Sequence, residues 1–335
     1  MTSYLGFGTA LPEYVIGPEA AQAALGRLWP RLRAGATTAE MVTRHTVLPL
    51  DRVVERRSVG EAMRLYAEHA PGLARLAACR ALAAGGTSPD EIDLVVSVSC
   101  TGYLVPSLDV RLAAEMGLRS DVIRLPLTEL GCSGGAAAMA AAHRHLAAYP
   151  DDRVLVVAVE LPSLSFQPDD RSLDNLTASM VFGDGAAAAV LGGTGRDGLR
   201  LLAAESRLLP RSERALGFDL RDSGFHVVLD RRLPQLIETG LGQVVADFRR
   251  KHGVPEPDFY AVHAGGPRIF DAVESALGLT HGQLAASRSV FREVGNLSSA
   301  SILYGLAALP HDLVGDGLAL AFGPGVTIEL AHLQR

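Results

Sequence analysis

The chain has 335 residues, of which 48% are hydrophobic and 20% charged, and its formal net charge is −6. This composition is typical of a globular protein with a large core and excludes a disordered or fibrous chain. The negative charge argues against general nucleic-acid binding, no apolar run reaches the length of a membrane span, and no signal peptide is evident. We therefore expect a cytoplasmic protein that binds neither nucleic acid nor membrane.

The first half of the chain alternates predicted strands and helices, as in an α/β protein. Apolar runs that are buried on both faces predict the strands, and the spacing of alanine and leucine predicts the helices. The predicted strands cover residues 4–9, 92–100, 121–127, 153–160 and the end of 180–191, and the predicted helices cover 18–32, 52–86, 107–116 and 132–149.

The second half repeats this order, with helices at 233–252, 268–276 and 297–309 and strands at 259–263 and around 319–329. The Gly131-Cys132 turn before a helix of small residues corresponds to the Gly295-Asn296 turn, and Phe182-Gly-Asp-Gly corresponds to Phe322-Gly-Pro-Gly. We therefore predict two related halves, residues 1–195 and 196–335. Stacking them about a pseudo-twofold axis would place Cys132 beside Asn296.

Cys132 is the first candidate for chemistry. It is one of three cysteines, with Cys79 and Cys100, and none forms a Cys-x-x-Cys metal or redox pair. A thiol at the start of a helix is close to unpaired N–H groups and to the positive end of the helix dipole, which favour the thiolate and hence a nucleophile. An inert cysteine buried in an alanine-rich helix is an equally good interpretation of this window.

His263, at the end of an apolar strand, and Asn296, at a helix start, are the other two candidates. An imidazole supports a thiolate, and an imidazole N–H together with an amide N–H₂ stabilises an oxyanion or enolate. Each residue alone also has an ordinary interpretation: His263 as a buried core histidine and Asn296 as a helix N-cap. Together with Cys132 they suit thioester chemistry.

Four motifs carry a resemblance: Leu130-Gly-Cys-Ser-Gly-Gly, His263-Ala-Gly-Gly-Pro-Arg, Gly295-Asn-Leu-Ser-Ser-Ala and Phe322-Gly-Pro-Gly-Val-Thr-Ile-Glu. They resemble the signatures of type III polyketide synthases, the chalcone synthase-like branch of the thiolase superfamily, over most of the chain. The segments 100–109 and 221–231 are similar to bacterial members, especially the tetrahydroxynaphthalene synthases. The resemblance implies two similar βαβαβαββ halves stacked as α/β/α/β/α layers.

The resemblance also implies the activity. An acyl-CoA starter is loaded on a cysteine, malonyl-CoA is repeatedly decarboxylated and condensed, and the product is cyclised to an aromatic ring or a pyrone. The substrates are CoA thioesters, and the enzyme is a homodimer without carrier protein, metal or nicotinamide. The alternatives are a ketoacyl synthase III-like enzyme with a single condensation and a non-catalytic relative. The starter, the number of extensions and the mode of ring closure are not set by the sequence.

By motif, Cys132 is implied as the nucleophile, with His263 and Asn296 stabilising the enolate. The remaining positions are implied to contact substrate or to shape its cavity. These are Phe182 and Phe225 as paired gatekeepers, Cys100 as an extra cavity cysteine, Thr101, Pro162, Ser165 and Ser298 as cavity lining, Phe218 where bacterial relatives have a tyrosine, Gly323, Pro324 and Gly325 as a rigid wall, Val105 and Pro106 on a loop that crosses the dimer interface, and Arg31 or Arg33 for CoA.

Overall fold

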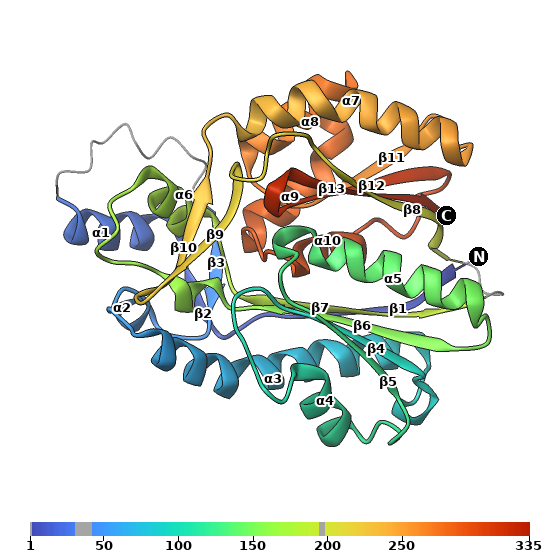
Figure 1. The fold of residues 1–335 in the computed structure, drawn as a ribbon, viewed down its shortest axis with the longest axis horizontal. Coiled ribbons are helices and arrows are strands. Elements are labelled where there is room, and N and C mark those ends of the chain that lie inside the picture. Colours follow the sequence, from blue (N-terminus) through green and yellow to red (C-terminus); the bar gives the residue numbers. More distant parts are fainter. Residues whose placement is uncertain (1, 31–41, 194–197) are drawn as a thin grey trace.

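A computed structural model describes residues 2–30, 42–193 and 198–335. Its main feature is one hydrogen-bonded sheet with the strand order β11-β12-β13-β8-β1-β7-β6-β4-β5. The sheet is folded into two stacked layers, which are joined where β1 pairs with β8 (Figure 1). Its strands are β1 (Thr2–Ala10), β4 (Leu94–Val98), β5 (Ile123–Leu127), β6 (Arg153–Glu160), β7 (Gly185–Gly192), β8 (Arg200–Leu208), β11 (Phe259–Val262), β12 (Asp316–Gly323) and β13 (Thr327–Gln334).

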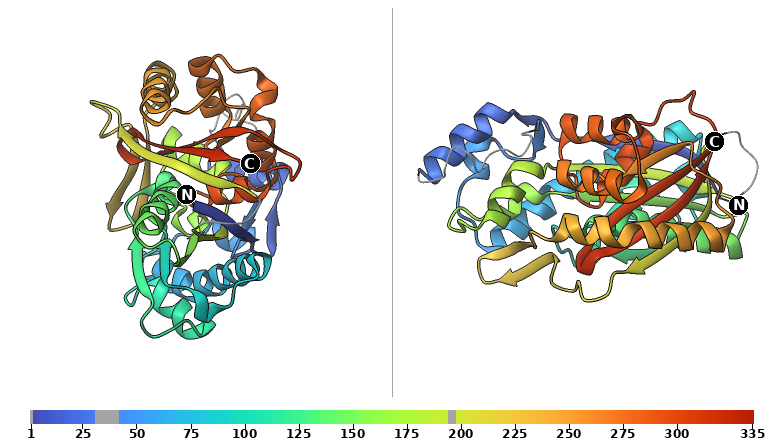
Figure 2. Two further views of the ribbon diagram at one scale, coloured as in Figure 1. Left: turned by 90° about the vertical axis from the view of Figure 1, so that its right-hand side faces the viewer. Right: turned by 90° about the horizontal axis from the view of Figure 1, so that it is seen from above.

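Helices cover the outer face of each layer and fill the space between them (Figures 1 and 2). The helices α3 (Val59–Gly85) and α4 (Leu108–Met116) pack on the layer of β1, β7, β6, β4 and β5. The helices α7 (Leu233–His252), α8 (Pro267–Leu277) and α9 (Ala285–Val294) lie outside the other layer, and α5 (Gly134–Ala148) and α10 (Ala300–Ala307) lie between the two. The result is the expected five-layer α/β/α/β/α arrangement.

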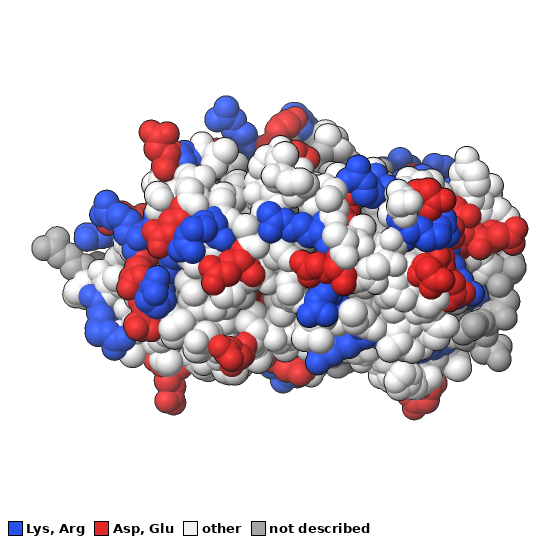
Figure 3. All heavy atoms as spheres, turned by 90° about the horizontal axis from the view of Figure 1, so that it is seen from below, with Lys and Arg blue, Asp and Glu red and all other residues white. Residues whose placement is uncertain are grey.

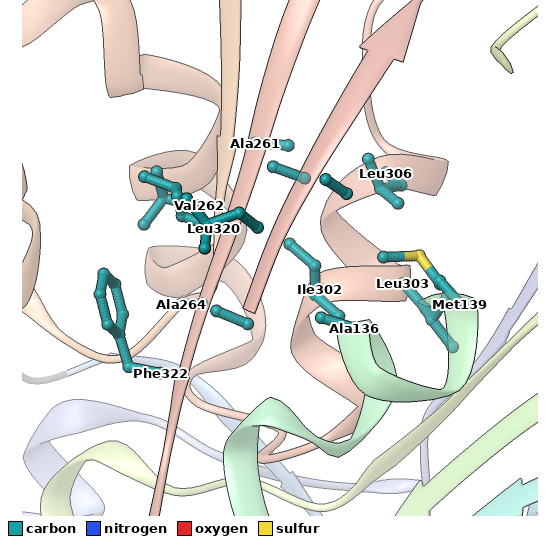
Figure 4. Packing of buried hydrophobic residues seen from close by; sticks show 14 of the residues in the cluster. Ala136, Met139, Ala261, Val262, Ala264, Ile302, Leu303, Leu306, Leu320 and Phe322 are labelled. Carbon is teal, nitrogen blue, oxygen red and sulfur yellow. The ribbon is translucent and has the colours of Figure 1, made fainter. Parts of the chain in front are cut away.

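The central helices α5 and α10 position the candidate site. Ala136 and Met139 of α5 lie against Ile302 and Leu303 of α10, and all four side chains are buried (Figure 4). The two helices begin close together, because a Cβ added at Gly135 would lie 2.2 Å from the carbonyl oxygen of Ser299. The turns that precede both helices therefore meet near the middle of the molecule (Figure 1).

A lateral group of smaller elements lies at the end of the molecule opposite the two termini (Figure 1). It contains two antiparallel strand pairs, β2 with β3 and the β9–β10 hairpin, and three helices. The elements are β2 (Tyr14–Ile16), β3 (Arg44–Thr46), β9 (Leu216–Arg221), β10 (Gly224–Leu229), α1 (Pro18–Leu28), α2 (Leu50–Val53) and α6 (Leu173–Val181).

Most predicted elements are present, and the differences are local. The long helical region 52–86 is two helices, because residues 54–58 break it. The helix predicted from Cys132 begins at Gly134, and the helix predicted to residue 32 ends at Leu28, before residues outside the described part of the chain. The β9–β10 hairpin was not predicted, and the described second half has no strand corresponding to β5. The division of the chain at residues 195 and 196 stays a prediction.

The face formed by α3 and α4 carries basic and acidic side chains intermixed (Figure 3). Within the described residues, no helix is long and apolar enough to cross a membrane. That part of the chain also holds no cluster of three or more histidine, cysteine, aspartate or glutamate residues arranged for a metal ion.

Candidate active site

Cys132 lies in the 3-10 helix η2 (Gly131–Ser133), directly before α5. Gly131 has φ +52°, in the left-handed region that favours glycine. A Cβ at Gly131 would also lie 2.6 Å from Cδ of Pro324, so the loop after β12 packs closely on this turn. The turn thus holds a buried thiol, 9% exposed, where α5 and α10 begin.

Asn296 lies in the loop between α9 and α10, and its backbone is fixed to the segment that ends α6. Its N–H donates to the carbonyl of Val181 at 2.7 Å, and its carbonyl accepts from the N–H of Gly183 at 3.0 Å. Its side-chain Oδ1 accepts from the N–H of Ser298 at 2.8 Å. The amide N–H₂ group is therefore left to face Cys132, and this hydrogen bond lowers the pKa of the thiol.

His263 directly follows β11, and its N–H donates to the carbonyl of Leu320 in β12 at 2.8 Å. The end of β12 leads to Gly323, where a Cβ would lie 2.1 Å from Oγ of Ser133, so this strand end abuts the turn of Cys132. The ring is 2% exposed, and neither Nδ1 nor Nε2 has a hydrogen-bond partner among the described residues. Buried polar atoms are rarely left without a partner, so the ring is positioned for a ligand.

The protonation states of Cys132 and His263 differ from the sequence-based expectation. Burial raises the pKa of the Cys132 thiol to about 11, although hydrogen bonds with Ser298 and Asn296 lower it. Burial also lowers the pKa of His263 to about 4. Burial therefore opposes the thiolate that the helix start was expected to favour. Near neutral pH the site holds a thiol and a neutral imidazole, which is available as a base.

Ser298 connects the two cysteines at the site. Its Oγ lies 3.2 Å from Sγ of Cys100 and 3.5 Å from Sγ of Cys132, and its backbone has φ +48°. Burial raises the pKa of Cys100 as well. Two thiols and one hydroxyl therefore share one hydrogen-bonded cluster. Cys100 was predicted to line the cavity, but it lies behind Ser298 and is not among the described lining residues.

Glu160 is a site residue that the sequence analysis missed. It is fully buried at the end of β6 and accepts hydrogen bonds from Oγ1 of Thr101 at 2.6 Å, from the N–H of Cys100 at 3.1 Å and from Oγ of Ser299. It thereby ties the segment after β4 to the start of α10. A charged residue at the end of an otherwise apolar strand was the signal in the sequence.

A cavity opens from this cluster toward the lateral group of elements. Six residues predicted to contact substrate line it, namely Thr101, Pro162, Ser165, Phe182, Phe218 and Ser298. Pro162 and Ser165 belong to the 3-10 helix η3 (Pro162–Ser165), and Phe182 follows α6. Arg44, Thr46 and Asn175 also line the cavity and were not predicted.

The other predicted contact residues lie around the cavity and not on its wall. Phe225 packs edge-on against Phe218, with ring centroids 6.2 Å apart, and is thus one layer behind the wall. Pro324 packs on the Cys132 turn, and the carbonyl of Gly325 accepts from Oγ of Ser212 at 2.6 Å. The Gly323–Gly325 loop therefore supports the Cys132 turn. Arg31 and Arg33 lie outside the described residues.

Comparisons with known proteins agree with this geometry. The family profile for the N-terminal domain of chalcone and stilbene synthases matches residues 31–195, and the profile for the C-terminal domain matches residues 200–334. The 1,3,6,8-tetrahydroxynaphthalene synthase of Streptomyces griseus is 40% identical over 295 residues, which cover 86% of this chain and 79% of that protein.

Solved structures give the same result. The crystal structure of 1,3,6,8-tetrahydroxynaphthalene synthase from Streptomyces coelicolor A3(2) has a TM-score of 0.93 and 33% identity, with 99% of both chains covered. The structure of CsyB complexed with CoA-SH has a TM-score of 0.91 and 28% identity over 100% of both chains. The expected thiolase-like fold is thus confirmed. The chain belongs to the chalcone and stilbene synthase family, the type III polyketide synthases, which are CoA-dependent condensing enzymes.

Proposed function

We propose that this chain loads an acyl group from CoA onto Cys132, extends it repeatedly with malonyl-CoA, and cyclises the product to an aromatic ring or a pyrone. Iterative condensation of malonyl-CoA is the general activity of type III polyketide synthases. One observation supports the residue assignment: the His263 ring is buried without a hydrogen-bond partner among the described residues, and the end of β12, which pairs with its backbone, abuts the turn of Cys132.

In the loading step, His263 accepts the proton of Cys132 as the sulfur attacks the thioester carbonyl. A neutral imidazole can act as this base, and burial keeps His263 neutral. Expulsion of CoA thiolate, which leaves as CoA-SH with the proton from His263, yields an acyl group on Cys132.

In the extension step, malonyl-CoA loses carbon dioxide and leaves an enolate on the remaining acetyl-CoA unit. The Asn296 amide and a ring N–H of His263 stabilise the enolate oxygen, because both are buried N–H donors. The enolate carbon attacks the thioester on Cys132, and the thiolate leaves. The cavity lined by Thr101 and Phe218 receives the growing chain.

Intact-protein mass spectrometry tests the loading step. A panel of acyl-CoAs should give one acyl adduct, on Cys132, and the Cys132→Ala variant should give none. Cys79→Ala removes an exposed cysteine far from the cavity and is the matched control, with an unchanged adduct. Isotope-labelled malonyl-CoA should then give products with two or more added units. Products with one unit only would instead support the ketoacyl synthase III-like alternative.

The predicted homodimer also belongs to this proposal. The strand β5 ends the sheet and pairs only with β4, while Ile123 is 52% and Leu125 37% exposed. An exposed apolar edge strand is a surface that normally pairs or is covered. The nearby loop also exposes Tyr103 (63%) and Val105 (78%). Sedimentation of the wild type should give a dimer, and Ile123→Lys should shift it toward monomer. A monomeric wild type would contradict the proposal.

The remaining partner predictions stay predictions. They are that the enzyme requires no acyl carrier protein, binds no nucleic acid and no membrane, and works in the cytoplasm. Activity with free CoA thioesters alone would confirm that no acyl carrier protein is required.

A further inference from the structure

The β9–β10 hairpin supplies part of the cavity wall, although its two strands belong to no larger sheet (Figure 1). Phe218 of β9 and Val227 of β10 lie directly opposite each other in the strand pair, and both line the cavity. A two-stranded hairpin on its own is marginally stable at best in water. The position of this part of the wall therefore depends on the contacts that tie the hairpin to the rest of the protein.

The hydrogen bonds that connect the hairpin to other described residues all end on residues 167–174. They join Nε2 of Gln167 to the carbonyl of Ser223 at 3.1 Å, Oδ2 of Asp174 to the N–H of Leu229 at 2.9 Å, and Oδ2 of Asp170 to Nδ1 of His226 at 3.1 Å. His226 is the one hairpin residue that uses its side chain in this set. A substitution can therefore remove this tie without changing the backbone pairing of the hairpin.

The ring of His226 is oriented toward Asp170 and is 8% exposed. Its Nε2 lies 2.7 Å from Oγ of Ser223 in the hairpin turn. Because a neutral imidazole has one donor and one acceptor nitrogen, the ring accepts from the Ser223 hydroxyl and donates to Asp170 through Nδ1–H. The guanidinium of Arg221 lies 3.4 Å from Nδ1 but can only donate, and it donates to Asp219. The Nδ1–H group is thus directed out of the hairpin.

Asp170 belongs to a segment that is itself held firmly. Its Oδ1 accepts from the N–H of Ser172 at 2.9 Å, and the carbonyls of Gln167 and Asp170 both accept from Nδ2 of Asn175 at 2.7 Å. Asn175 is buried in α6 and lines the cavity. Although burial raises the pKa of Asp170, hydrogen bonds from Ser172 and His226 lower it below its ordinary value. The hairpin is therefore tied to a fixed, negatively charged acceptor.

We propose that His226 is a positioning residue for chain extension. By holding the β9–β10 hairpin against Asp170, it fixes Phe218 and Val227 in the cavity wall and so limits how many malonyl units the cavity accepts. Without this contact the hairpin moves outward more often, and a longer chain fits. This inference rests on the proposed function, because it requires that the enzyme extend an acyl chain in this cavity.

Three variants isolate the contact. His226→Ala removes the donor, whereas His226→Asn keeps one, because the amide nitrogen of asparagine can take about the position of Nδ1. Asp219→Ala is the matched control. Asp219 lies directly opposite His226 in the strand pair, but its carboxylate is 60% exposed and pairs with Arg221 inside the hairpin.

Hydrogen–deuterium exchange measures how often the hairpin opens. The backbone amides of residues 216–229 should exchange roughly 10- to 150-fold faster in His226→Ala, as expected for the loss of a hydrogen bond to a charged group. Product masses from hexanoyl-CoA and isotope-labelled malonyl-CoA report the number of extensions. In His226→Ala the ratio of longer products to those of wild-type length should rise, by up to the same factor. His226→Asn and Asp219→Ala should resemble the wild type in both measurements.

An unchanged product distribution in His226→Ala overturns the inference even if exchange becomes faster, because the contact then serves stability alone. An equal change in Asp219→Ala, or no recovery in His226→Asn, overturns it as well. Asp170→Asn weakens the same contact from the other side and should shift the products in the same direction, which keeps the test available if His226→Ala does not fold. The proposed function fails in a different way: the wild type then gives no product with more than one added malonyl unit.

Discussion

The contact between Gly131 and Pro324 gives a sharp test of how the Cys132 turn is held. A methyl group at position 131 would meet Cδ and Cγ of Pro324 at 2.6 and 2.7 Å, and φ is +52° there. The left-handed backbone costs an alanine about 1 kcal/mol, and overpacking adds about 1–3 kcal/mol. Gly131→Ala should therefore lose about 2–4 kcal/mol of unfolding free energy. At roughly 2 °C per kcal/mol, the thermal midpoint should fall by about 4–8 °C.

Gly86 provides the matched control. Its φ is +57°, but a Cβ there would have no atom within 4 Å. Gly86→Ala should thus carry the backbone cost alone and lower the midpoint by about 2 °C. Pro324→Ala removes the two atoms that clash. In that background, Gly131→Ala should therefore lower the unfolding free energy by the backbone cost alone, without the about 1–3 kcal/mol of overpacking. The reasoning is refuted if Gly131→Ala is no worse than Gly86→Ala, or if Pro324→Ala gives no recovery.

Three further predictions concern the chemistry of the site. Asn296→Ala should leave acylation of Cys132 largely intact but slow malonyl-CoA decarboxylation by roughly two to three orders of magnitude; equal loss in both assays would contradict the assignment. Ser298→Ala removes a hydrogen bond that lowers the pKa of Cys132, so alkylation by iodoacetamide at pH 8 should slow by roughly 2- to 10-fold, and an unchanged rate would exclude this role. The pKa of His263 is about 4 in the folded protein and 6.5 in the unfolded chain. As the pH falls, the unfolded chain is therefore protonated first, and acid destabilises the fold through this residue. The His263→Gln variant lacks this titration. The difference between its unfolding free energy and that of the wild type should therefore rise by about 3 kcal/mol in favour of the variant between pH 7 and pH 4. A difference that does not change with pH would show that folding does not lower the pKa of His263.

Much of the fold could be predicted because its strands are apolar on both faces and its helices carry small residues on one face. The β9–β10 hairpin could not, because its strands mix polar and apolar residues and its two-residue turn, Asp222-Ser223, lacks the Asn-Gly or Asp-Gly signal of tight hairpins. The break at residues 54–58 was missed because it contains neither proline nor glycine.

The site could be predicted where chemistry leaves a local signal. Cys132, His263 and Asn296 each stand beside a glycine or at the end of an apolar run, and their spacing matches a known family. Arg44 has no such signal, because it lies in a three-residue strand whose burial depends on segments far along the chain. The pKa of Cys132 was mispredicted for the same reason: the helix start is local, but the desolvation that outweighs it comes from packing.

The donors without partners give the strongest link between this fold and its chemistry. Within the described part of the chain, six buried side-chain atoms lack a hydrogen bond, and three of them belong to His263 and Arg44. Each such buried atom costs about 1–3 kcal/mol of unfolding free energy. A thioester oxygen bound beside His263 would give that ring a hydrogen-bond partner, so part of this cost would be recovered when a substrate binds.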